Sequence, residues 1–236
     1  MVEQTARFEE VKIPLREPLH GLDAVSGILG IPEWWPTGSR ICMLIAHGSQ
    51  IKDPLLESLA RDLTSRKYLT LRFLLPHVEA KKTQLDPPAV LKRLFQSAVG
   101  LVNRDPTAAP AHIFVGGKNQ GALAAAHAAT GPVRAAGLFM LGYPLHRQGD
   151  MEKVQAERLY RATTPMLFVQ GDKDRYCDLK ALKETLKRVG APWDTHVVRS
   201  ADHALRLEEE SGRLEEDVFR DVLAKVEGWT TKVLGE

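Results

Sequence analysis

The amino-acid sequence predicts a three-layer α/β/α domain, in which helices cover both faces of a mostly parallel central sheet. Two observations carry this prediction. From residue 41 onward, short apolar runs of strand length alternate with amphipathic helical segments, which is the pattern of strands joined by crossover helices. No internal repeat or low-complexity linker divides the 236 residues. We therefore expect one domain over residues 1–236, a length that can bury a sizeable core.

The N-terminal third differs from the rest of the chain. Residues 8–15 and 22–31 alternate polar and apolar side chains, as half-buried antiparallel strands do. A connection rich in proline, tryptophan and glycine follows at residues 32–38, and this composition predicts a turn. We therefore expect an antiparallel pair of strands ahead of the parallel part of the sheet.

The central elements are predicted from local signals. Residues 41–46 form a continuous apolar run, which is typical of a strand covered on both faces. Asp53 and Pro54 supply the N-cap and first-turn residues of the next helix. By the same alternation we expect six parallel strands, at residues 41–46, 69–75, 113–115, 137–141, 166–170 and 194–199. The helices are expected at residues 54–67, 88–102, 122–129, 151–162, 179–189 and 214–233.

Composition and charge exclude several classes of protein. The 32 basic and 30 acidic residues are well mixed, so no basic block favours nucleic acid as a partner. The longest apolar stretches are strand-sized, far below the roughly 20 residues of a membrane span. Residues 1–15 are charged and lack a secretory apolar region. Two cysteines, Cys42 and Cys177, are too few for a disulfide framework. The sequence therefore predicts a soluble cytoplasmic protein with neither a nucleic acid nor a membrane as partner.

Four loops at the expected carboxyl ends of strands carry polar residues and glycine, where parallel sheets place their chemistry. The loops are His47-Gly48-Ser49, residues 116–121, residues 171–174, and Asp202-His203. In the second loop, Gly117, Asn119 and Gly121 form a G-x-x-x-G frame between an apolar strand and an alanine-rich helix. This frame is typical of a nucleophile elbow, a sharp strand-to-helix turn. The central residue of an elbow takes a positive φ, which asparagine tolerates well.

These segments make the sequence similar to the small, cap-less α/β-hydrolases related to dienelactone hydrolases and to the testis-expressed hydrolase-like proteins. The similarity covers residues 44–205, through His47-Gly48, residues 73–79, Asp86-Pro87-Pro88, residues 116–121, residues 141–145, residues 168–171 with Asp174, and Asp202-His203. In that family the elbow has the sequence Gly-Lys-Ser-Met-Gly, so Asn119 stands in the position of the serine. The resemblance implies an α/β-hydrolase fold without a cap domain. It also implies hydrolysis of an ester or other acyl bond in a small molecule, with no cofactor and no metal.

The resemblance further assigns roles to the acid and histidine loops. His203 would be the general base, and Asp174 would orient its imidazole, with Asp172 as the alternative acid. The order of elbow, acid and histidine along the chain is that of α/β-hydrolases. The remaining histidines show no spacing suited to metal ligation, namely His20, His77, His112, His127, His146 and His196.

An oxyanion hole is implied at the loop after the first central strand. A backbone N–H of Ser49 or Gln50 would pair with that of Gln120, and the two donors would hold the developing negative charge of a tetrahedral intermediate. Together with Asn119, Asp174 and His203, these residues would bound the substrate pocket.

Asn119 leaves three interpretations open. A carboxamide nitrogen has a delocalised lone pair and makes no acyl-enzyme of the usual kind, so the first is a binding or regulatory protein that has lost its nucleophile. The second is a substituted form of an active serine hydrolase. The third is an enzyme with an aspartate nucleophile that carries asparagine, although such enzymes usually have a cap domain and residues 143–162 are too few for one. Neither Ser49 nor Cys177 lies on an elbow of its own.

Overall fold

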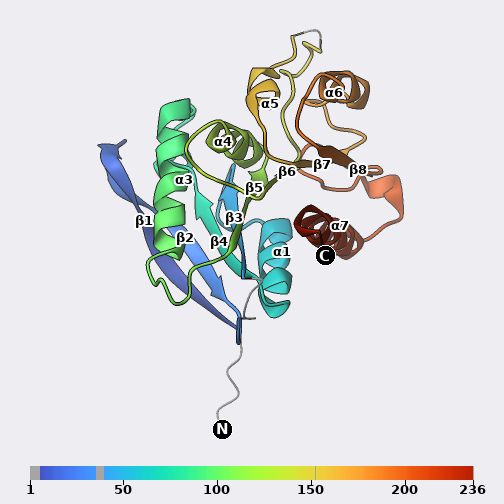
Figure 1. Ribbon diagram of the computed structural model, residues 1–236. Coiled ribbons are helices and arrows are strands. Elements are labelled where there is room, and N and C mark those ends of the chain that lie inside the picture. Colours follow the sequence, from blue (N-terminus) through green and yellow to red (C-terminus); the bar gives the residue numbers. More distant parts are fainter. Residues whose placement is uncertain (1–5, 36–39, 152, 236) are drawn as a thin grey trace.

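The computed structural model describes residues 6–35, 40–151 and 153–235. Within this part of the chain, eight strands form one sheet in the order β1-β2-β4-β3-β5-β6-β7-β8 (Figure 1). Their bounds are β1 (Arg7–Leu19), β2 (Leu22–Ile31), β3 (Ile41–His47), β4 (Leu69–Leu74), β5 (His112–Lys118), β6 (Gly137–Leu141), β7 (Met166–Gly171) and β8 (Trp193–Val198). Strand β2 is antiparallel to both β1 and β4. All neighbouring pairs from β4 to β8 are parallel.

This topology confirms the predicted fold class and the parallel pairing of the six central strands. It places the carboxyl ends of β3, β5, β7 and β8 at the same edge of the sheet. The four loops singled out in the sequence follow these four strands. Strand order and direction therefore bring segments that are far apart in the sequence to one edge.

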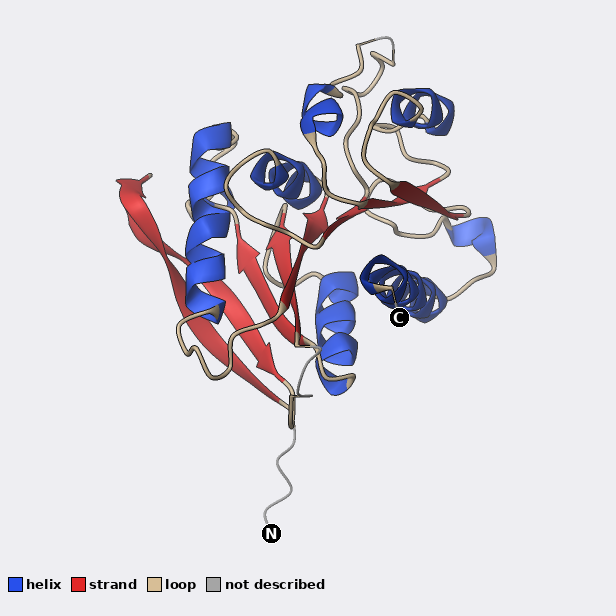
Figure 2. Cartoon of the chain, viewed as in Figure 1, coloured by secondary structure: helices blue, strands red, loops and turns tan. Residues whose placement is uncertain are grey.

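Helices cover both faces of the sheet, as Figure 2 shows. On one face lie α1 (Pro54–Ser65) and α7 (Glu215–Leu234), and their apolar residues pack on a core that includes Met43, Phe114 and Leu167. The other face carries α3 (Pro88–Val102), α4 (Gln120–Ala129), α5 (Glu157–Arg161) and α6 (Leu179–Leu186). Two short elements, α2 (Pro76–Glu79) and a 3₁₀ turn (Glu209–Ser211), complete the described helices.

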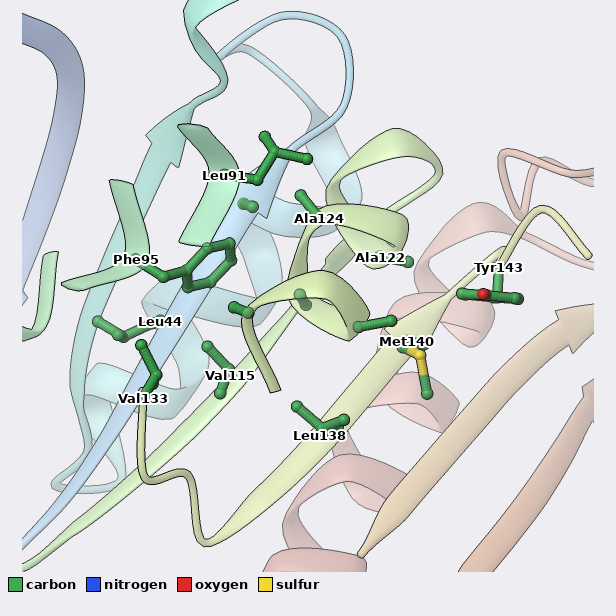
Figure 3. Close-up of a cluster of buried hydrophobic side chains, with 14 of the residues drawn as sticks. Leu44, Leu91, Phe95, Val115, Ala122, Ala124, Val133, Leu138, Met140 and Tyr143 are labelled. Atoms are coloured by element: carbon green, nitrogen blue, oxygen red, sulfur yellow. The ribbon is translucent and has the colours of Figure 1, made fainter. Parts of the chain in front are cut away.

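The core around α4 explains how the elbow helix comes so close to the sheet. Its buried residues are glycine and alanine, so its backbone approaches the strands without large intervening side chains. In Figure 3, Ala122 and Ala124 of this helix lie in the same cluster as Phe95 of α3 and Val115 of β5. Close packing of this kind fixes the helix on the sheet. The start of α4, where Asn119 lies, is therefore held by the core.

The helix predicted at residues 151–162 is wrong over its first half. Among the described residues of this segment, only Glu157–Arg161 is helical. The preceding residues instead fold back on the chain, because the N–H of Gln155 donates to the carbonyl of Leu145 at 2.8 Å. Met151 is 59% exposed, so its apolar side chain has no core to join. Tertiary hydrogen bonds here override helical spacing.

Two other expectations concern the N-terminal connection and the membrane. The turn predicted at residues 32–38 is irregular through residue 35, and residues 36–38 lie outside the described residues. None of the described helices is both long enough and apolar enough to span a lipid bilayer.

Candidate active site

The backbone of the elbow is strained at Asn119, and the glycines on either side give it the space that it needs. Asn119 lies between the end of β5 and the start of α4, with φ 54° and ψ −116°, a sparsely populated region that costs about 1–3 kcal/mol. A Cβ at Gly117 would lie 2.5 Å from the carbonyl oxygen of Ala46, and one at Gly121 only 2.0 Å from it. Both positions require glycine because backbone packs directly on backbone. The frame is thus set by steric contact with strand β3.

The acid and histidine loops meet through a short, buried hydrogen bond. His203 Nδ1 lies 2.8 Å from Oδ2 and 3.0 Å from Oδ1 of Asp174. The carboxylate is fully buried, whereas the imidazole is 18% exposed. A backbone N–H from Tyr176 also donates to Asp174 Oδ1 at 2.7 Å, which fixes the position of the carboxylate. Since an ionised carboxylate only accepts, Nδ1 is the donor and Nε2 of His203 is left as the basic nitrogen.

Asp172, the alternative acid, does not contact the imidazole. Its residue is exposed, and its N–H donates to the carbonyl of Val198 at 3.2 Å. Gly171, the residue before Asp172, is where the acid loop and the histidine loop approach each other closely. A Cβ on Gly171 would lie 2.0 Å from the carbonyl oxygen of Ala201. The structure therefore pairs Asp174 with His203.

Gly142 lies between the histidine loop and Asn119. A Cβ on this residue, whose φ is 59°, would lie 2.1 Å from the carbonyl oxygen of His203 and 2.9 Å from Oδ1 of Asn119. The Asn119 Oδ1 atom is buried and has no hydrogen-bond partner among the described residues. The structure thus brings the Asn119 side chain and the His203 backbone close to one glycine, which the sequence analysis placed in a matching segment without giving it a role in the site.

The Tyr176 ring packs against the imidazole of His203. Its ring centroid lies 4.7 Å from that of His203, and its hydroxyl donates to Gln148 Oε1 at 3.2 Å. Aromatic contacts of this kind favour one orientation of the imidazole. No pattern in the sequence points to this residue, because its role depends on the turn that follows Asp174.

The expected oxyanion donors lie at the junction of the elbow and the first loop. Gln120 is the first residue of α4, and first-turn N–H groups have no acceptor within their own helix. Gly48 packs against it, since a Cβ there would lie 2.7 Å from the Gln120 nitrogen. Ser49 and Gln50 follow directly and are exposed. Among the described residues, the N–H groups of Ser49 and Gln50 donate no backbone hydrogen bond, and both residues line the same cavity as Asn119.

A cavity of about 300 Å³ opens beside the elbow. Three of the expected pocket residues line it, namely Ser49, Gln50 and Asn119. Gln120, Asp174 and His203 do not, although the next residues after the histidine, Ala204 and Leu205, do. The other lining residues are Lys52, Asp53, Pro54, Leu55, Lys118, Arg206, Glu215 and Phe219. The cavity thus extends from Asn119 toward α1 and α7.

Other candidate nucleophiles and metal ligands are poorly placed. Cys177 is buried, accepts a hydrogen bond from Gln170 Nε2 at 3.1 Å, and has a pKa raised above its ordinary value by burial. A thiol held neutral in this way is a poor nucleophile. Among the described residues, no group of histidine, cysteine, aspartate and glutamate side chains is arranged to hold a metal ion.

The site loops contain a buried histidine that makes stability depend on pH. Burial lowers the pKa of His47 from 6.5 to about 4. Between pH 6.5 and pH 4, the unfolded chain therefore binds a proton at His47 that the folded chain does not bind. We therefore expect stability to fall as pH decreases from 6.5 toward 4, by about 3 kcal/mol from this group. Urea unfolding at pH 7, 5.5 and 4.5 measures the slope.

The His47→Asn variant provides the comparison for this pH dependence. It should lose less stability than the unmodified chain over the same range. Part of the slope will remain, because burial also lowers the pKa of His127 from 6.5 to about 4. Identical slopes for the variant and the unmodified chain would contradict the assignment to His47.

Comparison with known proteins places this geometry in a family. Residues 39–231 match the family described as alpha/beta hydrolase domain. An alpha-beta serine hydrolase homologue from Coxiella burnetii is 18% identical with a TM-score of 0.69, over 92% of this chain and 96% of that chain. Dienelactone hydrolase from Anabaena variabilis is 19% identical with a TM-score of 0.70, over 97% of this chain and 98% of that chain.

A third similar structure is a serine hydrolase without a lid from Xanthomonas campestris. It is 16% identical with a TM-score of 0.67, over 95% of each chain. At these identities the likeness of the three structures to this chain shows the fold. The family match spans residues 39–231, which include all four site loops. This chain belongs to the alpha/beta hydrolase domain family.

Proposed function

We propose that this chain binds small ester or acyl compounds at a serine-hydrolase-type site, and that Asn119 leaves it with little or no turnover. The observation that carries the proposal is the elbow geometry of Asn119 beside an intact pair of His203 and Asp174. The family is esterase-like. Its usual chemistry needs a hydroxyl at this point of the elbow.

The chemistry that asparagine removes is the covalent step. In a serine hydrolase, the histidine takes the hydroxyl proton while the oxygen attacks the acyl carbon, and the oxyanion N–H groups hold the resulting charge. The Asn119 carboxamide has no hydroxyl, and the lone pair of its nitrogen is delocalised, so it cannot attack the acyl carbon in this way. His203 and the N–H groups near Gln120 would still bind the acyl group and polarise it. Positioning and oxyanion binding alone contribute roughly 10³–10⁴-fold over water.

The size of the cavity supports a small ligand. Its volume of about 300 Å³ is at the lower end of the range for small-molecule sites. Pro54, Leu55 and Phe219 give it apolar lining, which suits a short acyl chain or alcohol group. The same contacts suit a second function, a non-catalytic binding or regulatory protein. That alternative is favoured by the strained elbow, which persists at Asn119 without a hydroxyl to present.

A turnover assay on the unmodified chain tests the proposal. We expect slow hydrolysis of a short p-nitrophenyl ester without an initial burst, and no labelling by a fluorophosphonate probe. Any residual rate should fall in His203→Gln. Short-chain carboxylic acids should raise the melting temperature, and Ala204→Trp, which fills the cavity, should abolish that rise.

Two results of this assay would count against the proposal. A stoichiometric burst or covalent labelling of the unmodified chain would show that it carries an active nucleophile. If the chain shows neither ester turnover nor a rise in melting temperature with short-chain carboxylic acids, the cavity does not bind such ligands and the proposal fails. Thermal shifts without turnover would favour the binding protein over the weak enzyme.

A further inference from the structure

Residues 48–53, named here the 48–53 loop, connect β3 to α1 and carry Ser49 and Gln50. The loop has no regular secondary structure, and its tip is exposed. Among the described residues, no hydrogen bond is donated by the backbone N–H groups of residues 48–52. The hydrogen bonds that hold this loop are instead those that its oxygen atoms accept from other elements.

Three basic side chains of the central sheet bind the 48–53 loop. His47 Nδ1 lies 2.8 Å from the carbonyl oxygen of Gln50. Arg72 donates from Nη1 to the carbonyl oxygen of Ile51 at 2.7 Å. Lys118 donates from Nζ to Oδ2 of Asp53 at 2.8 Å. Loop positions 50, 51 and 53 are thus each bound by a different basic residue.

The three anchors come from three neighbouring strands and share one face of the sheet. Lys118 of β5 is in register with His47 of β3, and Arg72 of β4 is in register with Ile45, two residues before His47. Since side chains alternate between faces, His47, Arg72 and Lys118 all lie on the face covered by α1. All three residues are at least nine-tenths buried.

The charges in this cluster are matched. Arg72 approaches Glu57 Oε1 at 3.4 Å, and Lys118 is paired with Asp53. His47 remains neutral at pH 7, because burial and the nearby cations lower its pKa to about 4. Neutral His47 can donate from Nδ1 to Gln50, while its Nε2 is buried without a partner among the described residues. Burying a polar group costs free energy unless it is hydrogen-bonded or paired, and each of the three basic side chains has such a partner.

Lys118 has a special place because it precedes Asn119 in the elbow. Its partner Asp53 also caps α1, with Oδ1 accepting from the N–H of Leu56 at 3.1 Å. The ion pair therefore joins the elbow, the end of the 48–53 loop and the start of α1 in one contact.

We propose that Arg72 and Lys118, together with His47, are positioning residues that hold the Ser49 and Gln50 N–H groups beside that of Gln120, where an acyl oxygen binds. The proposal rests on the proposed function, since it assigns those N–H groups to a ligand oxygen. The role proposed for the three basic side chains is to order the 48–53 loop, and Lys118 also lines the cavity beside the elbow. They act through the backbone of the 48–53 loop.

The first test measures loop order and needs no activity. The double variant Lys118→Met with Asp53→Asn removes the ion pair without leaving a buried charge uncompensated, and asparagine still caps α1. We expect the ¹⁵N order parameters of Ser49 and Gln50 to fall from about 0.8 to below about 0.6. Lys118→Arg should keep them high. Lys232→Met, which breaks an exposed ion pair with Asp194, serves as the control.

The second test measures kinetics in the Asn119→Ser background. We expect the double variant to lower kcat for a short p-nitrophenyl ester by about tenfold or more, with KM within about threefold. Lys118→Arg should keep most of the kcat of the Asn119→Ser chain, and Lys232→Met should leave that kcat unchanged. Unchanged order parameters would overturn the anchoring role. Lowered order parameters with unchanged kcat would overturn the positioning role.

The two tests separate this proposal from the function on which it rests. If Asn119→Ser is inactive, the proposed function fails, but the order parameters of the unmodified chain and its variants still decide the anchoring. If Asn119→Ser is active and the double variant neither loosens the loop nor slows hydrolysis, only the positioning proposal fails.

Discussion

Asn119→Ser is expected to raise the hydrolysis of a short p-nitrophenyl ester by at least about 10³-fold over the unmodified chain. The substitution places a hydroxyl on an elbow that already has φ 54° and ψ −116°. The basic Nε2 of His203 is available because Nδ1 is bound to Asp174 at 2.8 Å. Serine is also smaller than asparagine, so the buried space around Oδ1 accommodates it. Initial rates and fluorophosphonate labelling measure the gain.

Matched variants separate nucleophile installation from general effects. Asn119→Ala should stay as slow as the unmodified chain, and Asn119→Ser with His203→Gln should lose most of the gain. Asn119→Asp tests the aspartate alternative, which predicts a preference for alkyl halides or epoxides over esters. A folded Asn119→Ser variant that neither labels nor hydrolyses any short ester would show that the site is not a hydrolase apparatus. The binding function would then be the better account.

Gly121→Ala is expected to destabilise the fold by about 3 kcal/mol or more, or to prevent folding. The new Cβ would lie 2.0 Å from the carbonyl oxygen of Ala46 and 2.7 Å from its carbonyl carbon. Both atoms belong to the backbone of a central strand, so no flexible side chain can move aside. Urea unfolding measures the loss.

Gly228→Ala is the matched control for this substitution. Gly228 lies inside α7, and a Cβ there would meet nothing within 4 Å. Alanine at such a helical position should raise stability by about 0.5–1 kcal/mol. Equal stabilities of the two variants would show that the elbow is not held by contact with β3.

The sequence predicts the parts of the site that depend on local patterns. Gly117 and Gly121 mark a steric requirement four residues apart, so the position of Asn119 follows from the chain alone. His203 follows from the order of strand-end loops. Asp172 and Asp174 cannot be separated in this way, because both follow β7 within one turn. The choice depends on tertiary geometry and on the hydrogen bond from the Tyr176 N–H to Asp174 at 2.7 Å.

The anchors of the 48–53 loop were missed for a related reason. A single charged residue in an apolar strand, such as Arg72, has the same appearance in the sequence whether it faces solvent or donates to the carbonyl of a loop residue. Its role depends on its neighbours in the sheet. Arg72 lies near the carboxyl end of β4, and His47 and Lys118 are the last residues of β3 and β5. The first half of the helix predicted at residues 151–162 is wrong because Met151 fits helical spacing but has no core to join.

The glycine frame has an evolutionary consequence. Gly48, Gly117 and Gly121 are required by backbone packing, so a lineage that loses the nucleophile stays under selection to keep the elbow as long as it must fold. Serine and asparagine codons of the AGY and AAY types differ by one nucleotide. A change between serine and asparagine at the elbow is therefore a single-nucleotide step on an unchanged backbone. The glycine frame would not have to change in either direction of such a step.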